Sequence, residues 1–168
     1  FALRLNDWRD VSEVSELANF VMPQIEQKVF HSYLNVEFVH FYRNLHSIPD
    51  FKASWTWHYD DCPKQFIKLF VHLNDVNEDN GCMQILEQAD GSYDVYESSR
   101  MGPNNLRSAN PVVQHLQRMY AGSRIPPEII DDTLDRGGSI VNLVGGLGKY
   151  YLLTPNIAHR ATVPKEGT

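Results

Sequence analysis

Strand-like segments come in two runs along this chain, and within each run no helix separates successive strands. Segments 36–45, 66–75 and 82–86 are rich in β-branched and aromatic residues, and segments 139–144 and 149–154 repeat this texture near the C-terminus. A parallel sheet of the dinucleotide-binding type needs alternating strands and helices. The order of segments therefore predicts an antiparallel β core with helices packed outside it.

Helical patterns flank these strands. Apolar residues recur at helical spacing between Val11 and Val29, after a start signal at Asp10, and Pro23 should kink or split this helix. A helical insert is predicted over about 90–136, where segments 110–122 and 126–138 carry proline and glycine signals at their ends. We expect one domain over residues 1–168, with the insert contributing substrate contacts.

Composition excludes several classes of partner. The net charge of −6 argues against nucleic acid and against an anionic membrane surface, and the apolar runs are too short for a membrane span. The two cysteines, Cys62 and Cys82, form no CxxC motif. We expect both to be reduced thiols in a cytoplasmic protein, with a single disulfide as the alternative.

A histidine and a carboxylate, His58 and Asp60, lie two residues apart in the stretch WHYD. On an extended chain such side chains share one face, roughly 7 Å apart at the backbone. A site with two histidines and one carboxylate needs a further histidine. His159 is the best candidate, because it follows a strand and a Thr-Pro-Asn turn. The alternative is a chance spacing in a chain with seven histidines.

Three motifs occur in a fixed order: WHYD, then HLNDVNEDNGCMQIL from His72 to Leu86, then GKYYLLTPNIAH from Gly148 to His159. Together they resemble the phytanoyl-CoA dioxygenase family, over about Ser54 to Pro164. Two stretches differ from the family pattern. EQADGSYD replaces a Pro-Gly-Ser-His motif and GLGK replaces a Gly-Asp pair, and neither position is a metal ligand in the family.

The resemblance implies a mainly-β fold, a double-stranded β-helix (jelly roll, cupin-like) with flanking helices. It implies an iron(II)/2-oxoglutarate-dependent dioxygenase in which His58, Asp60 and His159 bind Fe(II) and are the catalytic residues. The cosubstrates would be 2-oxoglutarate and molecular oxygen, acting on a small-molecule substrate. Halogenating relatives lack the carboxylate ligand, so the presence of Asp60 favours hydroxylation.

The far carboxylate of 2-oxoglutarate needs a cation, because a buried carboxylate without a partner is strongly destabilising. The family uses an arginine about ten residues past the distal histidine, where a guanidinium group matches the carboxylate. That position falls just beyond Thr168, so we expect the domain to lack its C-terminal end. Lys68 is the alternative cation if it points inward, and it is solvated if its strand face is exposed. Phe70 and Tyr42 are the other predicted residues of the cosubstrate pocket.

Two other functions stay open. One is a cupin-like metalloenzyme that does not use 2-oxoglutarate. The other is an inactive homologue that acts as a binding module. Formation of succinate from 2-oxoglutarate distinguishes the dioxygenase from both.

Overall fold

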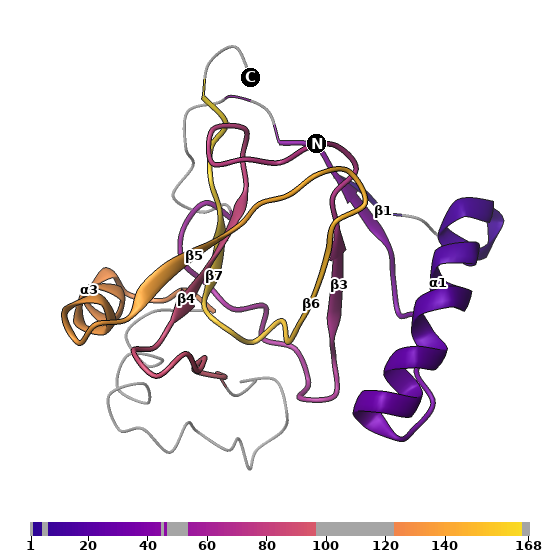
Figure 1. Cartoon of the computed structure of the whole chain (residues 1–168), viewed down its shortest axis with the longest axis horizontal. Helices are drawn as coiled ribbons and strands as arrows, with labels where there is room; N and C mark the ends of the chain where they lie inside the picture. The colour runs from indigo at the N-terminus through magenta and orange to yellow at the C-terminus, as the bar shows by residue number, and fades with distance from the viewer. Residues whose placement is uncertain (1, 5–6, 45, 47–53, 97–122, 166–168) are drawn as a thin grey trace. The chain divides into compact units, whose positions relative to one another are not determined.

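The structure is a computed structural model that describes residues 2–4, 7–44, 46, 54–96 and 123–165 (Figure 1). The chain divides into two compact units, Phe1–Asn44 and Leu45–Thr168. Among the described residues, no helix is both long enough and apolar enough to cross a lipid bilayer.

The first unit combines helical turns with a two-stranded ribbon. Strand β1 (Ala2–Arg4) pairs antiparallel with β2 (His40–Tyr42). Between them come a 3-10 turn η1 (Trp8–Asp10), helix α1 (Ser12–Ile25) and a π-helical turn η2 (Glu26–Phe30). Within the described residues 36–44 of the strand predicted over 36–45, only His40–Tyr42 is in a strand.

The N-cap of helix α1 lies one residue later than the sequence indicated. Its N-cap is Val11, without a side-chain hydrogen bond, while the Asp7 carboxylate caps η1 by accepting from Arg9 N at 3.0 Å. Pro23 lies inside α1 and has no N–H to donate to the preceding turn. The helical residues continue through Pro23 and change from α to π geometry at Glu26, so the chain is not split at Pro23, and a kink there stays a prediction.

Two antiparallel sheets form the second unit. Strands β3 (Lys68–Val71) and β6 (Tyr150–Leu153) make one sheet. In the other, β4 (Met83–Glu87) lies between β5 (Ser139–Leu143) and β7 (His159–Ala161). Every strand pair in the described parts of the chain is antiparallel, which confirms the predicted antiparallel core.

The two sheets share an apolar core. Met83 and Ile85 of β4 form a buried cluster with Leu143 and Ile157, and side chains of the other sheet pack against it, including Phe70, Tyr151 and Leu153. Alternate residues of a strand point to opposite faces, and burying one such side chain contributes about 1.5–3 kcal/mol. The interior between the sheets is therefore largely apolar.

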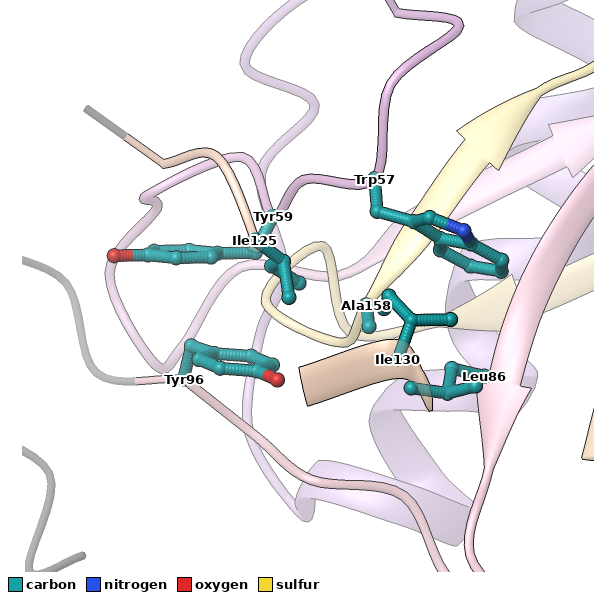
Figure 2. Close-up of a cluster of buried hydrophobic side chains, with 7 residues drawn as sticks. All are labelled: Trp57, Tyr59, Leu86, Tyr96, Ile125, Ile130 and Ala158. Carbon is teal, nitrogen blue, oxygen red and sulfur yellow. The ribbon is translucent and has the colours of Figure 1, made fainter. Parts of the chain in front are cut away.

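A second cluster lies on the opposite face of β4. Figure 2 shows its buried members, which are Trp57, Tyr59, Leu86, Tyr96, Ile125, Ile130 and Ala158. The rings of Tyr59 and Tyr96 stack with centroids 4.9 Å apart and planes 8° apart. This cluster joins β4 to the chain around His58 and to helix α3.

Helix α3 (Pro127–Asp135) has proline at its first position and ends before Gly137, whose φ is +90°. Gly137 N donates to Leu134 O at 2.9 Å, and a side chain in this left-handed conformation would be strained. The helix predicted within 126–138 is confirmed.

The rest of the predicted insert is described only in part. The helix predicted over 110–122 lies outside the described residues. Residues 91–96 are not helical, and Val95 forms an isolated antiparallel bridge with Ile157. The one-domain organisation stays a prediction. In the described parts of the chain, helices accompany antiparallel sheets, and the sheet content is compatible with a mainly-β fold.

Candidate metal centre

Backbone hydrogen bonds bring His58 beside His159. Each N donates to the other's carbonyl oxygen, at 3.0 and 2.9 Å, which makes an isolated antiparallel bridge. Asp60 N donates to Pro155 O at 2.9 Å, so the WHYD segment lies alongside the turn that leads into β7. Residues about a hundred positions apart thus meet, as the sequence predicted.

Side-chain ligand atoms of His58, Asp60 and His159 all lie within 4.8 Å of one another. Asp60 Oδ1 is 3.8 Å from Nε2 of His58 and 3.5 Å from Nε2 of His159. Both histidines are buried, with 8% and 3% of their surface exposed. This geometry allows the three atoms to bind one metal ion from one side.

The ring orientation of both histidines is held by the backbone. Nδ1 of His58 is 2.8 Å from Thr56 O, and Nδ1 of His159 is 2.9 Å from Ile157 O. A carbonyl oxygen only accepts, so each Nδ1 carries the hydrogen and each Nε2 presents its lone pair to the site. Ligating histidines in metal sites are held in this way.

Burial and neighbouring charges favour the ligating forms. Burial, followed by the charge of the adjacent His159, lowers the pKa of His58 to about 4. Burial alone would raise the pKa of Asp60, but contacts with His159 and Lys68 outweigh it and hold that pKa below its usual range. At neutral pH the site therefore offers a neutral imidazole and a carboxylate from WHYD.

Lys68 points toward this cluster. Its Nζ donates to Asp60 Oδ2, and about a third of its side chain is exposed. Of the two orientations left open by the sequence, the structure has the inward one. Because Lys68 occupies Oδ2, Oδ1 is the carboxylate oxygen that faces the two histidines.

The two other predicted pocket residues lie in different places. Phe70, on the same strand face as Lys68, packs against the core cluster between the sheets. Tyr42 belongs to the first unit, where its hydroxyl group lies 2.7 Å from His40 Nδ1. Its role in a cosubstrate pocket stays a prediction.

Sequence reasoning missed two residues of this region. Asn156 was interpreted only as part of a turn, yet it is 1% exposed and its side chain binds the backbone of Cys62. His72 opens the HLNDVNEDNGCMQIL motif without a role of its own, yet it is 3% exposed. No local pattern signals either, because their partners are 94 and 73 positions away.

No protein-family model, curated protein or solved structure matched this chain. The metal centre is therefore inferred from the residues themselves. Two imidazoles and one carboxylate on one face leave further coordination positions open to exogenous ligands, which is the arrangement of non-haem iron oxygenases.

Proposed function

We propose that this chain is an iron(II)/2-oxoglutarate-dependent dioxygenase that hydroxylates a small-molecule substrate. The observation that carries the proposal is the convergence of His58, Asp60 and His159 within 4.8 Å. The overall reaction would consume substrate, molecular oxygen and 2-oxoglutarate, and yield hydroxylated product, succinate and carbon dioxide.

The donor set fits a divalent iron ion. His58 and His159 would bind it through Nε2, because both Nδ1 atoms are turned to backbone carbonyl groups. Asp60 would bind through Oδ1 and balance part of the ionic charge. Bound Fe(II) would supply the redox chemistry with oxygen, on a face that keeps positions open for cosubstrates.

The neighbouring residues support cosubstrate binding. Lys68 uses one of its three N–H donors on Asp60 and retains others for a carboxylate. Because Lys68 contacts the metal ligand Asp60, we expect it to bind the 2-oxo acid end of 2-oxoglutarate, which chelates the metal, and not the far carboxylate. Phe70 lies two residues along the same face and would form an apolar wall for the methylene groups.

The sheet arrangement supports a double-stranded β-helix. Strands distant in sequence pair in both sheets, β3 with β6 and β4 with β7, and the two sheets pack face to face around one core. His58 bridges to His159 at the start of β7, which puts the triad at one end of a strand. The jelly-roll fold is the architecture that these pairings favour.

The test is uncoupled turnover. The purified 168-residue chain, loaded anaerobically with Fe(II), is given 2-oxoglutarate and oxygen, and succinate is measured. Wild type should form succinate, Asp60→Ala should form none, and Lys165→Met should match wild type because Lys165 pairs with Asp79 at the surface, outside the triad. Metal binding without succinate would contradict the proposal and favour a cupin-like metalloenzyme or a binding module.

A further inference from the structure

His72 directly follows β3 and holds a buried atom without a partner. Only 3% of the residue is exposed, and among the described residues its Nε2 makes no hydrogen bond. Its backbone is paired, since N donates to Lys149 O and O accepts from Gly148 N, each at 2.9 Å. An unpaired buried polar atom is destabilising, and native proteins contain few of them. A bound ligand is one partner that could satisfy Nε2.

The surroundings define what that partner can be. Nδ1 lies 3.3 Å from Gly145 O, which only accepts, so Nδ1 carries the hydrogen and Nε2 presents a lone pair. The imidazole ring lies against Phe70 and Tyr151, with centroids 5.9 and 5.6 Å away. The environment is thus aromatic, with a single unsatisfied acceptor.

His72 shares a strand face with the proposed cosubstrate residues. Lys68, Phe70 and His72 alternate along one face, since residues two apart on an extended chain point the same way. Lys68 contacts the triad at one end of this row. Phe70 lies between Lys68 and His72 in this row, and its ring contacts that of His72.

We infer that His72 Nε2 binds the far carboxyl group of an acyclic 2-oxo diacid whose 2-oxo acid end is held at the triad. This inference rests on the proposed function. It makes His72 the partner of the far carboxyl group of the cosubstrate, because Lys68 is engaged with Asp60 at the other end. The occupant is a dicarboxylic 2-oxo acid, because a monoacid of the same length would place a methyl group against Nε2.

Binding through this lone pair requires a proton. A carboxylate only accepts, so either His72 takes up a proton or the ligand arrives as its acid, and one proton enters the complex in both cases. An imidazolium in apolar surroundings is tolerated when an anion lies beside it. The Tyr151 ring lies beside His72; its hydroxyl group donates to Val144 O at 2.7 Å, and Lys149 Nζ lies 5.6 Å from that ring.

The test compares wild type with His72→Leu for the binding of diacids and of a monoacid. Manganese-loaded wild type and His72→Leu are titrated anaerobically by calorimetry with 2-oxoglutarate, 2-oxoadipate and the monoacid 2-oxovalerate. The substitution should weaken the better diacid by about tenfold or more and leave the monoacid within about twofold. Titrations in buffers of different ionisation enthalpy should show more proton uptake by wild type than by the variant.

Stability is the second readout. His72→Leu should unfold at equal or higher urea concentration than wild type in the absence of ligand, because it removes an unpaired atom. Gly145 O keeps a donor in the variant, since Val76 N also binds it at 2.8 Å. Tyr151→Phe is the matched control, because it removes a polar group from the same neighbourhood and should not change the preference for diacids.

The outcomes separate the two proposals. Equal diacid binding by wild type and His72→Leu would overturn this inference and leave a buried water as the partner of Nε2. A strongly destabilised variant would also overturn it, because His72 would then be structural. If manganese-loaded wild type binds none of the three acids, the proposed function fails and this inference fails with it.

Discussion

The side-chain amide of Asn156 binds both backbone groups of Cys62. Oδ1 accepts from Cys62 N at 2.9 Å and Nδ2 donates to Cys62 O at 2.7 Å, although the residues are 94 positions apart. Cys62 lies two residues past Asp60, and Asn156 lies three residues before His159. The amide thus ties the segment that carries one ligand to the turn that leads to another.

Asn156→Ala should weaken metal binding as well as folding. It leaves two backbone groups of Cys62 without this partner, which should cost about 2 kcal/mol of unfolding free energy. The loss of support for Asp60 should lower manganese affinity by about tenfold, the usual range for residues that orient metal ligands. Calorimetric titration and urea unfolding measure the two effects separately.

Thr133→Val is the matched control for that prediction. Thr133 is also buried, and its hydroxyl group donates to Ile129 O at 2.9 Å within α3. This variant should lose stability without losing manganese affinity. An Asn156→Ala protein with normal affinity would show that the amide serves folding alone.

Alanine at His58, Asp60 or His159 should lower the affinity for manganese or iron by at least about tenfold. Each substitution removes one of the three ligand atoms that lie within 4.8 Å of one another. His40→Ala, on β2, should leave the affinity unchanged. Unchanged metal content in all three triad variants would show that the site lies elsewhere.

The strands were predictable because their signals are local. Aliphatic residues at every second position mark β3, β-branched residues mark β5, and tyrosines mark β6. The partner of β2 was not predictable, because the pairing of β1 with β2 joins residues almost 40 positions apart and neither segment carries a turn signal.

The ligand triad could be inferred from residue types, but its supporting contacts could not. His58 and Asp60 lie two residues apart in one extended segment, whereas Asn156 acts through a contact between distant segments. The orientation of β3 was also ambiguous. Leu69 and Val71 on one face are as apolar as Phe70 on the other, and only packing between the sheets decides which face is inward.

Lys68→Met should weaken 2-oxoglutarate binding by about tenfold or more without weakening manganese binding. The variant loses a charged donor to the cosubstrate, and its partial exposure puts the effect at the low end of such losses. The positive charge of Lys68 lies next to the metal ligands and repels a metal cation. Its removal should therefore not weaken manganese binding. Calorimetry with metal alone, then with 2-oxoglutarate, separates the two steps.

Lys165→Met is the control for Lys68. Lys165 forms an exposed ion pair with Asp79, at 2.6 Å, and should affect neither titration. A Lys68→Met protein that binds 2-oxoglutarate as wild type does would remove Lys68 from the cosubstrate site.

Alkaline stability should depend on Tyr96. Burial, followed by the charge of Asp94 and the neighbouring Tyr59, raises the pKa of Tyr96 above its ordinary value of 10.0. Above that value the unfolded chain loses a phenolic proton that the folded chain retains, so this contribution to stability is complete below about pH 10 and is lost as the pH rises. The loss should be about 1.4 kcal/mol per pH unit.

Urea unfolding of wild type and Tyr96→Phe between about pH 9 and about pH 11 measures this loss, because the phenylalanine ring keeps the stacking on Tyr59 without titrating. The variant should lose less stability than wild type over this range, while Tyr150→Phe, at a position 60% exposed, should follow wild type. Parallel curves for wild type and Tyr96→Phe would mean that the Tyr96 hydroxyl group titrates as it does in the unfolded chain.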